Sequence, residues 1–365
     1  WARRVAPTLK HWTDWCSHIG KKLLDESINV DDIRKNFLKP EIVTSRPKLV
    51  PLAIAWPYYA YTVKNGALKI QYKGKSVDII DAGLTLVEYK NTGPIKFNVE
   101  IDDNSLEYEV VFSASGVSFK PTSADAKVLG HKGAIELSKY LNTYGLTIYF
   151  ENDTTITHTG YLLQYDRKLV FDPSGITDID WSGVDIRRES QGQERDSSTV
   201  QARTIKHLAD TGDWDFIVDD DGSGEIADIV AVKVKDQEVL IYLGHCKFSS
   251  ADQPGARVAD LYEVCGQAQK SVLWADSAKI LLKNLVRREK QRQLKGASGM
   301  VKGSLDDLLK LEARAKYLNA VFTVAIAQPG LAKSSISQQQ QHLLACTETY
   351  LYETYEIKFD VISSA

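Results

Sequence analysis

Long apolar runs are missing from this 365-residue chain, so no segment has the length needed to cross a bilayer as a helix. The first residues, WARRVAPTLKHW, also lack the apolar core of a secretion signal. We therefore expect a cytoplasmic protein with no membrane partner. Its hydrophobic content of 43% predicts a globular chain that can bury full cores.

Cysteine and methionine are scarce. The four cysteines, Cys16, Cys246, Cys265 and Cys346, lie far apart and without CxxC spacing, which argues against a zinc ribbon and against a disulfide framework. The only methionine is Met300, so the chain starts without an initiator residue. From this we expect a piece of a longer polypeptide.

The chain also has no overall excess of basic residues, since its net charge is −3. This charge excludes a globally basic nucleic-acid binder. The stretch 279–295, KILLKNLVRREKQRQLK, is an exception, with seven basic residues against one acid. Its apolar positions predict a helix with one buried and one basic side, on which Arg287 and Arg288 are candidates for phosphate contact. A solvated surface helix is the alternative for this stretch.

The sequence pattern changes along the chain and predicts three parts. Residues 1–45 are expected to form a helical segment, the tail of a preceding region, whose last helix stops before Pro40. Residues 46–172 alternate short apolar segments with Gly, Asn and Asp, which is typical of an antiparallel, β-rich accessory domain. Within it, 131–145 predicts a helix. We expect no catalytic constellation in this domain.

The third part, residues 173–365, begins with a linker rich in Gly, Ser and Asp. It then predicts the order helix, strand, strand, strand, helix, followed by further helices and two more strands. A meander flanked by helices and extended by strands that follow helices indicates an α/β sandwich with a mixed sheet.

Two nucleotide-binding motifs bear on this part. The GSGEIA segment at 222–227 fits a dinucleotide-binding pattern, but three aspartates precede it and a strand follows it, so we interpret its glycines as a turn. No GxxxxGK[ST] sequence occurs, which argues against ATP binding through a P-loop.

A predicted hairpin, ADIVAVKVKDQEVLIYLGHCKFS, carries polar residues at the end away from its Asp-Gln turn. Pairing across this turn places Asp228 opposite His245, with their β-carbons about 5 Å apart and Lys247 as the diagonal neighbour. Side-chain alternation turns Cys246 to the other face, where its thiol is buried. Because the turn lacks Gly and Asn, a slip of one residue is the alternative register.

This cluster suits phosphodiester hydrolysis. A carboxylate from Asp228 can hold a divalent cation beside a phosphate, and Lys247 can position the attacking water and balance charge in the transition state. Cys246 can add its backbone carbonyl as a hard oxygen ligand.

At these residues the sequence resembles the PD-(D/E)xK nuclease superfamily, which has the restriction-endonuclease-like fold. The resemblance covers about 197–365 and rests on the order of elements and on the D-x(16)-[X]-x-K spacing. It implies that Asp228 is the metal-binding acid, Lys247 the catalytic lysine and Cys246 the carbonyl donor to Mg²⁺ or Mn²⁺. The sequence departs from the pattern at His245, where the family has Glu or Asp. Either His245 is a ligand and favours manganese, or Glu225 supplies the missing charge.

More specifically, the segments DDDGSGEIADIV, HCKFSSADQPGARVADLYEVCGQAQKS and AQPGLAKSSIS resemble the nuclease end of bacterial helicase-nuclease polypeptides associated with defence against foreign DNA. This resemblance implies DNA as the partner, and a helicase or ATPase region in the same polypeptide or complex.

The helix expected after the lysine offers further candidates for contact with DNA. Gln267, Gln269 and Lys270 are polar positions on or near its solvent side, and Arg257 precedes it. Ordinary solvated polar residues are the alternative for these positions. For the whole chain, the alternative to a metal-dependent deoxyribonuclease is an inactive DNA-binding or protein-docking module that keeps the nuclease fold.

Overall fold

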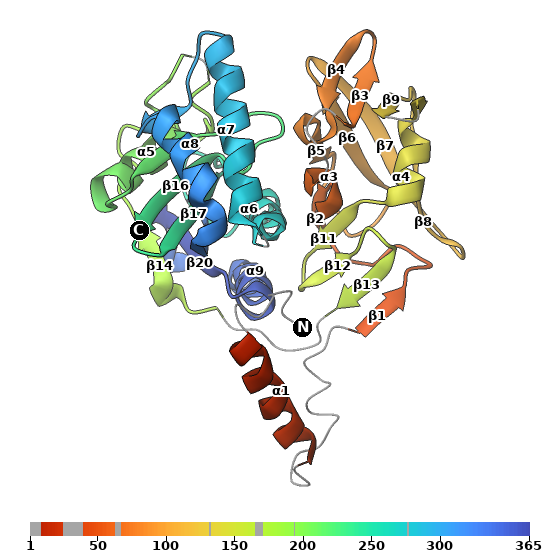
Figure 1. The fold of residues 1–365 in the computed structure, drawn as a ribbon, viewed down its shortest axis with the longest axis horizontal. Helices are drawn as coiled ribbons and strands as arrows, with labels where there is room; N and C mark the ends of the chain where they lie inside the picture. Colours follow the sequence, from red (N-terminus) through yellow and green to blue (C-terminus); the bar gives the residue numbers. More distant parts are fainter. Residues whose placement is uncertain are drawn as a thin grey trace.

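The computed structural model describes residues 9–24, 39–62, 67–130, 133–164, 171–192, 194–275 and 277–365. It shows a mixed α/β protein with several sheets, in which a β-rich part (39–164) lies beside a C-terminal part (171–365) with one large sheet (Figure 1). Helix α1 (Leu9–Leu24) projects away from both parts. Within the described ranges, no helix has the length and apolar character needed to cross a membrane.

Two local predictions in the first half of the chain differ in part from the structure. Pro40 lies in strand β1 (Lys39–Ile42) within the segment expected to be helical, and the helix expected just before it lies outside the described residues. Helix α4 (Leu137–Tyr144) is shorter than predicted, because strand β10 (Gly133–Glu136) precedes it and pairs with β9 (Lys127–Gly130). Pairing with a neighbouring strand satisfies backbone groups in a way that local sequence periodicity does not reveal.

Three sheets make up the β-rich part, as its punctuated sequence predicted. Strand β6 (Ile95–Ile101) alternates strictly between buried and partly exposed residues, the period of a half-buried strand. The first sheet contains β1, β13 (Tyr161–Gln164), β12 (Thr154–Ile156), β11 (Thr147–Phe150) and β2 (Pro51–Ala55); the second contains β10, β9, β3 (Lys69–Tyr72) and β4 (Lys75–Asp78); the third contains β5 (Gly83–Leu86), β6, β7 (Asn104–Ser113) and β8 (Gly116–Pro121). Helix α3 (Tyr58–Thr62) follows β2.

One mixed sheet organises the C-terminal part, and the predicted order of its elements is confirmed. In spatial order its strands are β14 (Ile176–Asp178), β20 (Lys358–Ser364), β19 (Asn319–Ala332), β17 (Glu238–Cys246), β16 (Ile229–Lys235), β15 (Phe216–Asp219) and β18 (Met300–Lys302). The strands from β14 to β17 pair in parallel, and those from β17 to β18 pair antiparallel.

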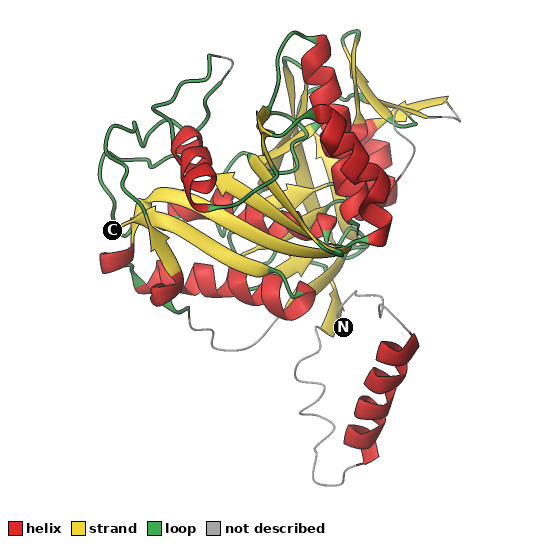
Figure 2. Ribbon diagram, turned by 60° about the vertical axis from the view of Figure 1, so that its left-hand side comes forward, coloured by secondary structure: helices red, strands yellow, loops and turns green. Residues whose placement is uncertain are grey.

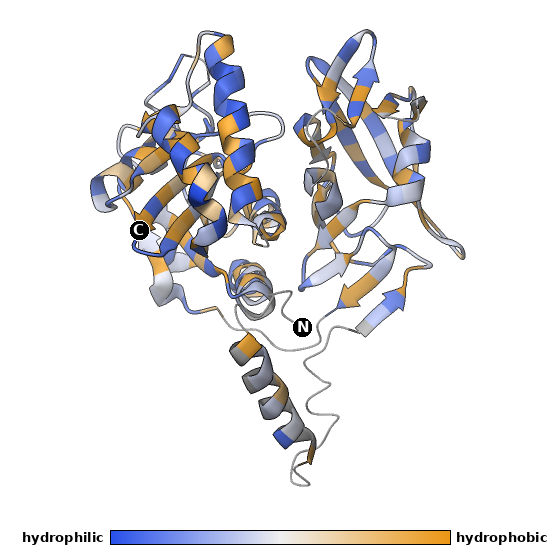
Figure 3. Cartoon of the chain, in the orientation of Figure 1, coloured by the Kyte–Doolittle hydropathy of each residue, from blue (hydrophilic) through white to orange (hydrophobic). Residues whose placement is uncertain are grey.

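Helices cover both faces of this sheet (Figure 2). Helix α5 (Val200–Thr211) packs on one face, and α6 (Ala259–Lys270), α7 (Ala278–Leu294), α8 (Leu305–Arg314) and α9 (Gln338–Tyr355) contribute to the core on the other. Figure 3 shows apolar residues alternating with polar ones along α7, as expected for a helix with one buried side.

The hairpin of β16 and β17 has the predicted register. Ile229 pairs with Gly244 at one end and Lys235 with Glu238 at the other, so the ladder runs without a slip. Asp236 takes a left-handed φ of 54°, which allows the two-residue turn to close without Gly or Asn. The register therefore directs Asp228 and His245 to the same end of the sheet.

The two parts of the chain share a hydrophobic core. Strand β2 lies against α6 so closely that a β-carbon built on Gly266 would be 2.2 Å from the carbonyl oxygen of Leu52. Leu52 and Ala53 belong to the same buried cluster as the helices of the C-terminal part. Glycine at position 266 therefore permits backbone-to-helix contact between the two parts.

Candidate functional site

The end of the hairpin holds four of the predicted site residues, Asp228, His245, Cys246 and Lys247. Asp228 directly precedes β16 and is buried, with its Oδ2 accepting a hydrogen bond of 2.8 Å from the backbone N–H of Cys246. The Cys246 thiol points to the opposite face, into the core under α5, as predicted. Strand pairing thus holds the Asp228 carboxylate at the strand end.

A loop before β16 adds two more carboxylates. In this acidic loop, residues 219–228, one ligand oxygen from each of Asp221, Glu225 and Asp228 lies within 4.8 Å of the others. The backbone N–H of Gly222 donates a 2.9 Å hydrogen bond to Oε2 of Glu225, and Gly222 and Gly224 both have positive φ, as expected of turn glycines. Three carboxylates this close could hold a hard divalent cation.

Burial and mutual repulsion perturb these carboxyl groups. Burial, followed by the negative charge of Asp221, raises the pKa of Glu225 to about 8. Burial and the charge of Glu225 raise the pKa of Asp228 well above its usual range. Without a cation Glu225 therefore retains a proton near neutral pH, whereas a bound cation would favour the ionised carboxylates.

His245 lies beneath this cluster and is not part of it. Its side chain is only 3% exposed, its Nε2 lies 2.7 Å from Oγ of Ser271, and its Nδ1 lies 3.9 Å from Oδ2 of Asp228. Burial, and then the charge of Lys270, lowers the pKa of His245 to about 3, so the ring is neutral. Nδ1 has no hydrogen-bond partner among the residues that the structure describes, which is unusual for a buried polar atom.

Lys247 lies between two glutamates on different elements. Its Nζ is 3.0 Å from Oε2 of Glu189 and 2.8 Å from Oε2 of Glu263, and its side chain is 14% exposed. Burial alone would lower the pKa of Lys247, but the two carboxylates outweigh it and raise the pKa. Burial raises the pKa of Glu189, against the opposing effect of Lys247. Lys247 is thus a fixed, charged ammonium group.

These groups surround a pocket of about 340 Å³ between the two parts of the chain. Asp228 and Lys247 lie behind its lining and contact it through the carboxylates described above. The polar lining includes five carboxylates and one ammonium group: Glu100, Glu189, Asp221, Glu225, Glu263 and Lys270. This excess of negative charge would repel a phosphate unless a cation were present.

The pocket also receives residues predicted to contact DNA. Gln267 and Lys270 line it from α6, and Oε1 of Gln267 is buried without a hydrogen-bond partner in the described part of the chain. Burial lowers the pKa of Lys270, against the opposing attraction of Glu225 and Asp228. A polar amide and an ammonium group therefore face the same space as the carboxylates.

The other predicted DNA contacts are engaged inside the protein. Gln269 is buried and donates a 3.2 Å hydrogen bond to Thr347 on α9, and Arg257 donates to Asp260, Ser249 and the carbonyl of Gln253. Neither side chain is directed into the pocket lining.

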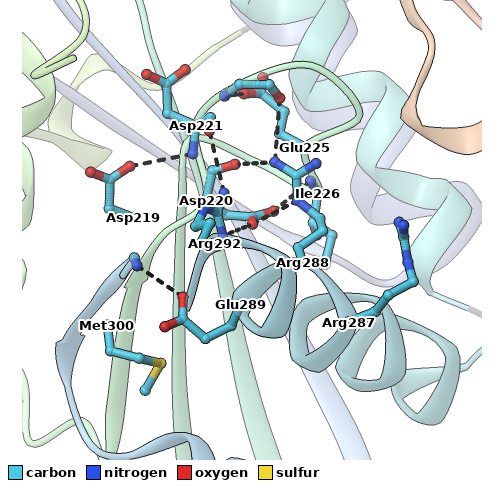
Figure 4. A network of polar contacts seen from close by, with 12 residues as sticks. Asp219, Asp220, Asp221, Glu225, Ile226, Arg287, Arg288, Glu289, Arg292 and Met300 are labelled. Atoms are coloured by element: carbon cyan, nitrogen blue, oxygen red, sulfur yellow. Dashed lines mark hydrogen bonds and ion pairs between the residues drawn. The ribbon is translucent and has the colours of Figure 1, made fainter. Parts of the chain in front are cut away.

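Two of the three arginines of α7, Arg288 and Arg292, support the acidic loop. Arg288 is buried, bonds to Asp220 at 2.8 Å and also donates to the carbonyls of Asp220 and Ser223. Figure 4 shows Arg288 and Arg292 both directed at Asp220, with Arg287 apart from this network. Asp220 in turn accepts from the N–H of Ile226 at 2.9 Å. These ion pairs hold the acidic loop against α7.

Sequence reasoning did not identify four carboxylates near the site: Glu100, Glu189, Asp221 and Glu263. Glu189 comes from the segment interpreted as a linker, which instead adds strand β14 to the large sheet. Asp221 was interpreted only as an obstacle to pyrophosphate binding, and Glu100 lies in the part expected to carry no site residue. The run of three aspartates beside Glu225 was the one signal that could have indicated Asp221.

No protein-family model, curated protein or solved structure matches the chain. The class of molecule therefore follows from its fold and geometry: it is a mixed α/β protein with an acidic pocket and a fixed lysine behind the pocket lining.

Proposed function

We propose that this chain is a divalent-metal-dependent phosphodiesterase that cleaves DNA. The observation that carries the proposal is the convergence of Asp221, Glu225 and Asp228, whose ligand oxygens lie within 4.8 Å of one another at the strand end from which Lys247 emerges. Carboxylates with raised pKa values at or directly behind the lining of a pocket are a common property of functional sites.

The arrangement of the elements supports a restriction-endonuclease-like sandwich as the finer description of the C-terminal part. A helix, three antiparallel strands and a second helix follow one another along the chain, and the acid and the lysine come from the second and third strands. We further propose, from the resemblance of the sequence, that the chain acts within a cytoplasmic helicase-nuclease defence system, with a helicase or ATPase region in the same polypeptide or complex.

The residues present fit Mg²⁺ or Mn²⁺. Asp221, Glu225 and Asp228 would hold the cation through hard oxygen ligands, with the carbonyl of Cys246 as a further donor. A cation bound there would polarise the phosphate and lower the pKa of a water molecule. We assign the second metal ligand to Glu225 and not to His245, because the histidine lies outside the carboxylate cluster and its Nε2 is at Ser271.

The chain's own residues would supply orientation and charge. Lys247, held by Glu189 and Glu263, orients a water molecule and balances the negative charge that develops on the phosphoryl oxygens. Lys270 and Gln267 provide a cation and an amide toward the substrate phosphate. Arg288 and Gln269 are left out of the proposed DNA contacts because their polar groups already have partners inside the protein.

The inactive-module alternative has one observation in its favour, which is that Lys247 already has two carboxylate partners. The two possibilities differ in a direct assay. We expect the purified chain to cut labelled DNA in the presence of manganese or magnesium. Cleavage should stop in excess EDTA. Glu225→Gln should reduce the rate of cleavage by at least about 100-fold. Loss of a group that only hydrogen-bonds to a metal ligand reduces activity by about 10- to 100-fold, and loss of the ligand itself should have a larger effect.

A matched control removes a carboxylate elsewhere. Asp306→Asn changes an exposed aspartate of α8 outside the pocket lining and should leave the rate unchanged. Cleavage that continues undiminished in EDTA, or a Glu225→Gln protein as active as the Asp306→Asn control, would refute the proposed mechanism.

A further inference from the structure

The β-rich part forms one wall of the pocket, opposite the acidic loop. Strands β2 and β5 and the segment that follows β5 contribute Ala53, Leu84, Thr85 and Tyr89 to the lining, and Glu100 comes from β6. This part was expected to be an accessory domain without a site. Its residues face the proposed catalytic groups directly.

Contacts on several sides of the pocket hold this wall in place. Oγ of Ser223, in the acidic loop, donates to the carbonyl of Asp81 at 2.9 Å and accepts from the N–H of Gly83 at 3.1 Å. Arg287 binds both carboxylate oxygens of Asp81 at 2.6 Å. The acidic loop and α7 are thus both bonded to the segment that leads into β5.

Aromatic contacts hold other points of the same boundary. The ring of Tyr89 is stacked on that of Tyr262 in α6, with 6.3 Å between centroids and an interplanar angle of 15°. Tyr61 meets Trp274 edge to face at 5.0 Å, and β2 lies directly against Gly266. Separation of the wall would break these contacts and expose part of a shared core.

We infer that the β-rich part restricts the substrate to single-stranded DNA or to the frayed end of a duplex. Such DNA enters the pocket as a strand that is one nucleotide wide. This inference rests on the proposed function. A space of about 340 Å³ lies at the small end of the range for pockets that hold small ligands, and the proposed catalytic groups lie at or behind its lining. An intact duplex, whose major groove alone is about 12 Å wide, cannot bring a phosphate to them past a fixed wall.

Tyr89 has a specific part in this arrangement. Its ring lines the pocket, and aromatic rings bind unpaired bases without sequence preference because each base has a π-face. Burial, and then the charge and hydrogen bond of Glu263, raises the pKa of the Tyr89 phenol, so the ring remains neutral. Tyr89 would therefore position a base while Lys270 faces the adjoining phosphate.

The test compares four substrates of equal length with manganese: linear and circular single strands, a blunt duplex and a closed circular duplex. We expect both single strands to be cut, the blunt duplex to be cut slowly from its ends, and the closed duplex to remain intact. Tyr89→Ala should raise KM for single strands about tenfold or more with little change in kcat. Tyr89→Phe should raise KM less than Tyr89→Ala does, because stacking is retained.

A binding measurement separates this inference from the proposed function. Fluorescence anisotropy with Asp228→Asn should show tighter binding of single-stranded than of duplex oligonucleotides. Cleavage of the closed duplex as fast as of single strands would overturn the inference and leave the nuclease function standing. A protein that cuts none of the four substrates would overturn the nuclease function, and equal binding of both DNA forms would then overturn the strand selectivity as well.

Discussion

Gly224 offers a direct test of the contact between the acidic loop and the β-rich part. It has a φ of +73°, and a β-carbon at this position would lie 2.5 Å from Cα of Asp81 and 2.9 Å from the carbonyl oxygen of Ile80. These neighbours are backbone atoms, which cannot move aside as a flexible side chain can. Gly224→Ala must therefore shift either the loop or the segment around Asp81.

The expected cost has two sources. A left-handed backbone costs a non-glycine residue roughly 1–2 kcal/mol, and overpacking of a close contact adds about 1–3 kcal/mol. Gly224→Ala should therefore lower the free energy of unfolding by about 2–5 kcal/mol. Gly296→Ala is the matched control, because Gly296 has a φ of +78° and a β-carbon added there would have no atom within 4 Å. It should cost only about 1–2 kcal/mol.

Urea unfolding followed by tryptophan fluorescence measures both variants. We also expect Gly224→Ala to weaken manganese binding, since Gly224 lies between Asp221 and Glu225 in the loop. If Gly224→Ala and Gly296→Ala lose the same stability and bind manganese like the wild type, the close contact does not hold the loop, and the reasoning is wrong.

The remaining predictions concern charge. Because the pKa of Glu225 rises from 4.5 to about 8 on folding, the folded protein retains a proton that the unfolded chain loses, so metal-free stability should fall as pH rises from about 4.5 to 8. Glu225→Gln should flatten that part of a plot of urea midpoint against pH; an unchanged slope would contradict this assignment. By the same linkage, manganese binding should release protons, which calorimetry in buffers of different ionisation enthalpy detects as a difference in apparent heat. Lys247→Met should keep most of the manganese affinity and lose cleavage, whereas Asp228→Ala should lose both; normal cleavage by Lys247→Met would refute the role of the lysine. Arg288→Met should lower the free energy of unfolding by about 3–5 kcal/mol, because it removes an ion-pair partner of the buried Asp220 carboxylate. A loss below about 1 kcal/mol would show that Arg292 compensates.

Local sequence patterns are enough to predict most elements of the C-terminal part, but not strands β14 and β18, and to predict the register of its central hairpin. Apolar periodicity is a local property, and a two-residue turn relates each residue of one strand to a single partner on the next. For this reason the approach of Asp228 to His245 and the burial of the Cys246 thiol could be predicted from spacing alone, and both were confirmed.

The packing of distant elements determines which side chains share the pocket. Glu189 and Glu263 are far apart in the sequence and meet at Lys247, and Glu100 arrives from a different sheet. Tertiary packing also places His245 below the acidic cluster, with the histidine ring at Ser271, although the position of His245 in the strand made this residue a candidate ligand. Such contacts depend on how separate sheets and helices pack, and the free energy that brings them together comes from burial of apolar residues elsewhere in the chain, so the polar residues themselves carry no local signal of their neighbours.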